Sequence, residues 1–205
     1  MPHGEDNLKM SYQERLLLKE AVESRHCEAL GRVLTSFQHL EHRLTEIVGY
    51  LVDKHDFQLG IIITSEISFR NLINLAYSLA PHRKMDLERV DSLREILKDC
   101  FAAEQRRNQL IHSYWEPEPE SLQVTRFKYT AKYSKGYKHQ IEDVTEVNLL
   151  EFAGDLIGLS LDLTELMDAH ESNWSKYTTF PNPDNPSSSL LPKNLQSALN
   201  EEENA

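Results

Sequence analysis

Apolar residues recur every three or four positions along most of the chain, which is the spacing of helices that bury one face. The pattern is strongest over residues 27–54, and a shorter stretch over 11–25 also predicts a helix. A further helix is expected to begin at Thr64 or Ser65, since either side chain can cap it. It should end before Pro81, because the residue before a proline avoids helical geometry.

Two more helices are predicted in the second half of the chain. One begins after Asp86, a capping residue, and continues to Trp115-Glu-Pro-Glu-Pro, where the prolines end it. The other begins near Asp143 or Thr145 and extends to about His170. The low content of turn residues, 7 Gly and 8 Pro, also favours long helices.

Between these two helices, over residues 121–142, the period changes to two. Valine, phenylalanine, tyrosine and threonine are frequent there, and Ser134-Lys135-Gly136 is a turn candidate, so the segment predicts a β-hairpin. The alternation assigns the side chains to two faces: Arg126, Lys128, Thr130 and Lys132 on one, and Phe127, Tyr129, Ala131 and Tyr133 on the other.

These elements predict a mainly α protein: a bundle of four to five helices with a β-hairpin inserted after the third main helix. We expect one helical domain over residues 1–170, with its core over 27–170 and the hairpin at about 121–142. Residues 171–205 contain Pro-Asn-Pro-Asp-Asn-Pro-Ser-Ser-Ser and an acidic end, a composition that predicts a disordered tail.

The charge distribution is uneven. The net charge of −11 argues against a protein that coats nucleic acid non-specifically. Residues 121–141 nevertheless contain no acid and five basic residues: Arg126, Lys128, Lys132, Lys135 and Lys138. This segment is either an RNA-holding arm, in which tyrosines stack on bases, or a solvated edge whose lysines block strand-to-strand aggregation.

Cysteine usage and hydropathy point to a cytoplasmic protein. Cys27 and Cys100 form no spacing pattern and are expected to be reduced thiols. No apolar run approaches the roughly 18 residues that span a bilayer, and the first residues do not resemble a signal peptide. His39 and His42 share a helix face but lack a completing ligand, so no metal site is expected.

Arg107 occupies an unusual position on the third main helix. At about 100° per residue, it lies at the centre of an apolar stripe. The residues within roughly 40° of it are Leu93, Ile96, Cys100, Ala103, Ile111 and Tyr114. Arginine keeps its charge, so burial there requires a carboxylate, a polar network or a cleft open to anions.

Arg107 and His112 together offer the chemistry for cleaving a phosphodiester without a metal. Guanidinium binds phosphate oxygens bidentately, and imidazole exchanges a proton near pH 7. On an ideal helix the two side chains point about 140° apart. Either the helix bends or ends near Ser113, or a second copy of the chain supplies the other half, so the spacing indicates a composite site in a dimer.

Two polar residues between them are candidates for supporting roles. Asn108 lies one turn before His112 on the same side of the helix. Glu104 lies one turn before Asn108, where it either pairs with Arg107 at i,i+3 or steers His112. The i,i+3 ion pair is the commoner arrangement.

Structural roles are the alternative for the same residues. Arg107 and His112 would then form a buried polar network that fixes a helix junction or a dimer interface without turnover. Tyr114 would be a core aromatic at the end of the stripe. Glu66 and Arg70 form an i,i+4 pair that is expected to be structural.

The run Arg107-Asn108-x-x-x-His112 on a helical domain resembles the signature of the HEPN superfamily, Arg-x4–6-His, often with Asn after the Arg. The resemblance covers about residues 27–170. Tyr114 extends it to Arg-x4-His-x-Tyr, the form typical of HEPN toxins encoded beside a minimal nucleotidyltransferase, which modifies the matching tyrosine with AMP. The basic hairpin, the helix before residue 27 and the tail make this chain longer than the compact toxins.

The resemblance implies a helical bundle and a metal-independent endoribonuclease that dimerises so that two motifs line one cleft. His112 is then the general base or acid on the ribose 2′-OH or the leaving 5′-oxygen, and Arg107 stabilises charge on the phosphorane. Asn108 orients His112 or contacts the phosphate. The product is a 2′,3′-cyclic phosphate and no cofactor is implied.

The expected partners are RNA, a second copy of the chain and an antitoxin of the minimal nucleotidyltransferase type. Such an antitoxin would inhibit a toxin or defence effector. The alternative is a non-catalytic HEPN module that binds a nucleotide or a protein.

Overall fold

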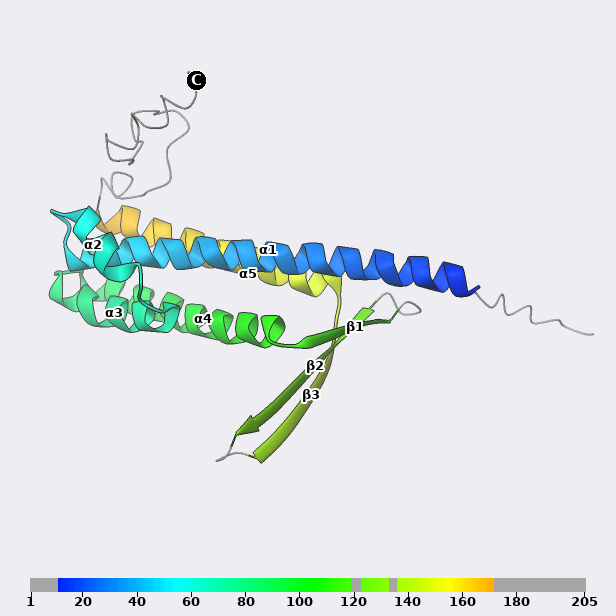
Figure 1. Ribbon diagram of the computed structural model, residues 1–205. Helices are drawn as coiled ribbons and strands as arrows, with labels where there is room; N and C mark the ends of the chain where they lie inside the picture. The colour runs from blue at the N-terminus through cyan, green and yellow to red at the C-terminus, as the bar shows by residue number, and fades with distance from the viewer. Residues whose placement is uncertain (1–10, 119–122, 133–135, 172–205) are drawn as a thin grey trace, which may run out of the picture.

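The computed structural model describes residues 11–118, 123–132 and 136–171, with side chains described except at 130–132. The described elements are, in chain order, α1 (Tyr12–Val52), α2 (Phe57–Thr64), α3 (Phe69–His82), α4 (Leu87–Ile111), β1 (Tyr114–Glu118), β2 (Gln123–Lys132), β3 (Gly136–Val144) and α5 (Glu146–His170). The α1 and α5 helices lie side by side, and α3 and α4 pack beneath them (Figure 1). The predicted mainly α fold is confirmed.

The α1 helix, 41 residues long, is the central element of the fold. It begins with a capping box, in which the Ser11 hydroxyl accepts the Glu14 N–H at 3.2 Å and the Glu14 carboxylate accepts the Ser11 N–H at 2.7 Å. The two helices predicted over 11–25 and 27–54 are therefore one. Its first turns extend beyond the other helices (Figure 1), and its buried face begins at Val22.

The core lies where α1 meets α3, α4 and α5. Each of these helices contributes large apolar side chains, and burial of one such side chain contributes about 1.5 to 3 kcal/mol. The largest fully buried side chains are Phe37, Leu40, Leu44, Ile47, Leu51, Leu72, Leu93, Leu110, Leu149, Leu156 and Leu163.

The segment before α3 differs from the prediction. The predicted cap, Thr64 or Ser65, is instead the end of α2, and α3 begins after Ser68. The α2 helix packs on α1 through two glycines, and a Cβ on Gly60 would lie 2.2 Å from the carbonyl oxygen of Gly49. The α3 helix also continues through Pro81, which lies in its last turn, where few backbone hydrogen bonds depend on it.

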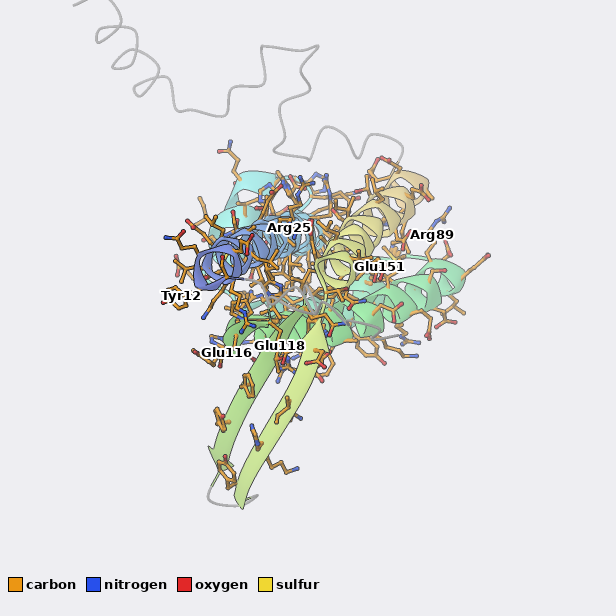
Figure 2. All side chains as sticks on the ribbon, turned by 90° about the vertical axis from the view of Figure 1, so that its right-hand side faces the viewer. Tyr12, Arg25, Arg89, Glu116, Glu118 and Glu151 are labelled. Carbon is orange, nitrogen blue, oxygen red and sulfur yellow. The ribbon has the colours of Figure 1, made fainter. Side chains whose placement is uncertain are left out.

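The sheet has three antiparallel strands in the order β1-β2-β3. The predicted hairpin is β2 and β3, whereas β1 was not predicted. The outer part of the hairpin projects away from the helices (Figure 1 and Figure 2). After β3, Thr145 caps α5 with its hydroxyl accepting the Asn148 N–H at 3.1 Å, and α5 ends at His170 as predicted.

Several expectations fall outside the described residues: the tail over 172–205, Ser134 and Lys135 of the turn, and the side chain of Lys132. Within the described part of the chain, no helix combines the length and apolar character needed to cross a membrane.

Candidate functional site

The candidate site forms where α4 ends. Asp86 starts this helix by accepting the Arg89 N–H at 3.0 Å, as predicted. The helix ends at Ile111, and His112 is its C-cap residue, with its own N–H donating to the Asn108 carbonyl at 3.3 Å. One of the two predicted resolutions of the Arg107–His112 angle, a helix that ends near Ser113, is therefore observed.

Tyr114 does not belong to the apolar stripe of α4. It is the first residue of β1, and 62 % of its surface is exposed. The prediction of a core aromatic at the end of the stripe is wrong, because the helix stops three residues before Tyr114.

Arg107 lies against the core, as the apolar stripe predicted. Its guanidinium carbon is 4.1 Å from the centre of the Phe37 ring of α1, a cation–π contact with a core side chain. Its Nη1 donates to Oδ1 of Asn108 at 2.8 Å. Its Nε is buried and has no hydrogen-bond acceptor among the described residues. The arginine is thus held by an aromatic ring and an amide, neither of which cancels its charge.

Neighbouring arginines, by contrast, are paired with carboxylates. Arg106 binds both oxygens of Glu142 at 2.9 and 2.7 Å, and Arg126 binds Oε2 of the same residue at 2.6 Å. Arg70 of α3 reaches Glu104 of α4 at 3.1 Å.

Among the described residues, no carboxylate lies within ion-pair distance of Arg107. The predicted Glu104–Arg107 pair is wrong, and so is the Glu66–Arg70 pair. Arg70 crosses from α3 to α4, where its guanidinium also lies 4.7 Å from the centre of the Phe101 ring. Glu104 therefore bridges two helices instead of pairing along its own.

The Glu142 cluster joins the hairpin to the end of α4. Hydrogen bonds from Arg106, followed by those from Arg126, lower the pKa of Glu142 from 4.5 to about 2. Arg126 is only 3 % exposed, and its Nη1 also donates to the Ser113 hydroxyl at 3.1 Å and the Gln109 carbonyl at 3.3 Å. This network fixes the root of the hairpin beside the Arg-x4-His motif.

The residues predicted to contact RNA therefore differ in their exposure to solvent. Arg126 is buried in the network, and Lys128 is half-buried, with its Nζ donating to the Asn108 carbonyl at 3.3 Å. Lys138 is exposed. Five basic residues were predicted to contact RNA, and Lys138 is the one among them whose described side chain is exposed to solvent.

His112 is exposed, and its ring makes no hydrogen bond to a described residue. A second histidine near the motif was not predicted. His26 of α1 is buried, 4.5 Å from the Trp115 ring, and neither ring nitrogen has a hydrogen-bond partner in the part of the chain that the structure describes. Burial lowers the pKa of His26. The burial of His26 could have been predicted from the sequence, because its helical spacing places it between Val22 and Ala29 on the buried face of α1.

Comparison of the chain with protein-family models, with curated proteins and with solved structures found no match. Within the described residues, no three His, Cys, Asp or Glu side chains come together as metal ligands.

Proposed function

We propose that the chain is a metal-independent endoribonuclease of HEPN type, active as a homodimer. The observation that carries the proposal is the contrast between Arg107, which has no described carboxylate partner, and Arg70, Arg106 and Arg126, which each have one. A half-buried guanidinium with its charge uncompensated favours an anion such as a phosphodiester.

The chemistry follows from the two side chains of the motif. His112 removes the proton from a ribose 2′-OH as general base, or protonates the leaving 5′-oxygen as general acid. The 2′-oxygen attacks the adjacent phosphorus, the bond to the 5′-oxygen breaks, and a 2′,3′-cyclic phosphate remains. Arg107 stabilises the charge that grows on the phosphorane. Asn108, already bonded to Arg107, holds the guanidinium in place.

Dimerisation is part of the proposal because His112 lacks an orienting hydrogen bond from the described residues of its own chain. A catalytic imidazole is usually held by a second group, and a second copy would supply it. Apolar side chains are available for such an interface: Leu16 and Leu17, 54 % and 66 % exposed, lie on α1 before its buried face begins at Val22.

We further propose that the enzyme is a toxin or defence effector restrained by a partner protein. Tyr114, two residues after His112, is exposed enough to be reached by a modifying enzyme. Transfer of AMP to its hydroxyl would add a bulky, negatively charged group two residues from His112 and so hinder RNA binding.

The experiment is cleavage of RNA by the purified chain in the presence of EDTA. We expect cleavage by the wild type and a loss of about 10²- to 10⁴-fold in His112→Ala. His82→Ala, at the exposed C-terminal end of α3 far from the motif, is the matched control and should keep full activity. Intact RNA, or cleavage that survives His112→Ala, would overturn the proposal.

Arg107→Met distinguishes a catalytic role of Arg107 from a structural role. Because Arg107 has no ion pair to lose and its Nε is already unbonded, this variant should remain folded with its unfolding free energy within about 1 kcal/mol of wild type. Its activity should fall about 10²- to 10³-fold. If Arg107→Met dissociates or unfolds instead, the arginine is a structural element.

The second candidate is a non-catalytic HEPN module that binds a nucleotide or a protein partner. The exposed His112 ring, without an orienting group, favours it. Affinity for RNA or nucleotides without turnover, together with normal growth of cells that overproduce the chain, would select this candidate.

A further inference from the structure

The β2–β3 hairpin extends beyond the support of the helices. We call residues 127–132 and 136–141 the arm; in both views it projects from the helical body (Figure 1 and Figure 2). At its root Lys128 still contacts α4, whereas further out the two strands pair with each other. A two-stranded hairpin alone is only marginally stable in water. An arm of this kind is therefore expected to present a surface to a partner.

One face of the arm is a ladder of aromatic rings. The register sets Tyr129 opposite His139, and their rings stack with centres 4.6 Å apart and planes 6° from parallel. Tyr137 continues the ladder outward, 6.4 Å from Tyr129, and Phe127 continues it inward, 6.3 Å from His139. Their planes differ by 23° and 16°.

These rings are open to solvent. Tyr129 and Tyr137 are 57 % and 67 % exposed, and His139 is also exposed. Cross-strand aromatic pairs stabilise a hairpin. That role alone does not explain why the side chains of Tyr129 and Tyr137 are more than half exposed.

The ladder leads to the candidate active site. Its innermost ring is Tyr114, whose centre lies 6.2 Å from that of Phe127. Tyr114 is two residues after His112 in the sequence. A ligand lying along the rings would therefore run from the arm to the Arg-x4-His motif.

The charge of this segment suits a polyanion. The sequence over 127–141 contains four lysines and no acid, whereas the whole chain has a net charge of −11. Lys138 lies on the face opposite the rings, since it pairs with Thr130, and its long side chain can reach past the strand edge. Aromatic rings on which bases stack, together with basic side chains that attract the phosphates, are the combination that binds single-stranded nucleic acid.

We propose that the ladder Tyr114, Phe127, His139, Tyr129 and Tyr137 binds the bases of single-stranded RNA and guides the strand to His112. This inference rests on the proposed ribonuclease function and specifies its substrate as unpaired RNA. Bases in a duplex are stacked on one another and cannot reach the rings.

The test measures binding separately from cleavage. The probe is a fluorescein-labelled 2′-O-methyl RNA 12-mer, which lacks the free 2′-OH and so cannot be cut, offered single-stranded or as a duplex to the full-length chain. Fluorescence anisotropy gives the dissociation constant. We expect the single strand to bind at least about tenfold more tightly than the duplex, and Tyr129→Ala to weaken single-strand binding about tenfold.

Two variants serve as controls. Tyr129→Phe keeps the stacking ring and should bind like wild type. Tyr77→Ala removes a tyrosine of similar exposure, 50 %, from α3 and should also bind like wild type. Far-UV circular dichroism verifies that each variant is folded.

Three results would overturn the inference: equal affinity of Tyr129→Ala and wild type, equal affinity for single strand and duplex, or a change of oligomeric state in Tyr129→Ala measured by light scattering. The last would identify the arm as a protein interface.

If the wild type binds the probe as expected yet leaves unmodified RNA intact, the ribonuclease proposal fails and the ladder stands. If Tyr129→Ala cleaves and binds like wild type, the ladder fails and the ribonuclease stands.

Discussion

Replacement of Glu142 by glutamine tests how the hairpin is fixed to α4. The substitution keeps the shape of the side chain and one oxygen acceptor but removes the charge that Arg106 and Arg126 share. Arg126 is almost fully buried, so the change leaves a cation in the interior with only the Ser113 hydroxyl, the Gln109 carbonyl and one amide oxygen as acceptors.

The magnitude follows from the pKa of Glu142, which the two arginines lower from 4.5 to about 2. Lowering this pKa from 4.5 to about 2 corresponds to about 3.4 kcal/mol. The carboxylate is 35 % exposed, and solvent screening reduces this to about 1.5 to 2 kcal/mol. Removing one partner of a buried pair costs up to about 3 to 5 kcal/mol, and the remaining acceptors of Arg126 lower that value. We therefore expect Glu142→Gln to lower the free energy of unfolding by about 2 kcal/mol.

Urea unfolding followed by circular dichroism at pH 7 and at pH 3 gives the assay. Because the pKa of Glu142 is depressed in the folded chain, its contribution is present above about pH 4.5 and is lost as the pH falls toward 2. The difference between variant and wild type should therefore shrink at pH 3. Glu116→Gln, an exposed acid on β1 (Figure 2), should change stability by less than about 0.5 kcal/mol. A Glu142→Gln chain as stable as wild type at pH 7 would refute the reasoning.

Two further predictions concern packing and pH. Gly60→Ala should lower the free energy of unfolding by about 3 kcal/mol or more, because the added Cβ would meet the Gly49 backbone. Gly31 has open space around it, so Gly31→Ala should raise the free energy of unfolding by about 0.5 to 1 kcal/mol. Similar chemical denaturation curves for the two alanine variants would contradict the close approach of α1 and α2. Burial lowers the pKa of His26 in the folded chain, so as the pH falls the unfolded chain binds a proton before the folded chain does. The free energy of unfolding therefore decreases as the pH drops below about 6.5. His26→Phe should reduce the drop in melting temperature between pH 7.5 and 5.5, and an unchanged drop would show that His26 is not the group responsible.

Elements whose signals are local in sequence were predictable. Asp86 caps α4 as predicted, and Thr145, one of the two predicted starts, caps α5, because a capping side chain bonds to an N–H within its own first turn. The position of Arg107 against the core likewise follows from the helical period alone.

Elements that depend on contacts between distant segments were not predictable. Pro117 of β1 was interpreted as part of a helix end, yet a strand tolerates proline at the edge of a sheet, where β1 lies. The α2 helix has a β-branched run and a glycine, and it depends on the close approach of Gly60 to α1. The Glu104–Arg70 pair joins residues 34 positions apart, so the nearer partner at i,i+3 was the wrong choice. Burial of Arg126 has the same origin, since Glu142 and Ser113 come from other elements.

The central claim is that Arg107 and His112 cleave RNA by attack of its own 2′-OH. The most direct measurement uses a DNA 12-mer that contains one ribonucleotide, incubated with the purified chain in EDTA and examined by mass spectrometry. The account predicts a single cut immediately 3′ of the ribonucleotide, a 2′,3′-cyclic phosphate on the 5′ fragment, and no product with His112→Ala. Cleavage of the all-DNA strand, a linear phosphate formed as the first product, or the same cut by His112→Ala would contradict it.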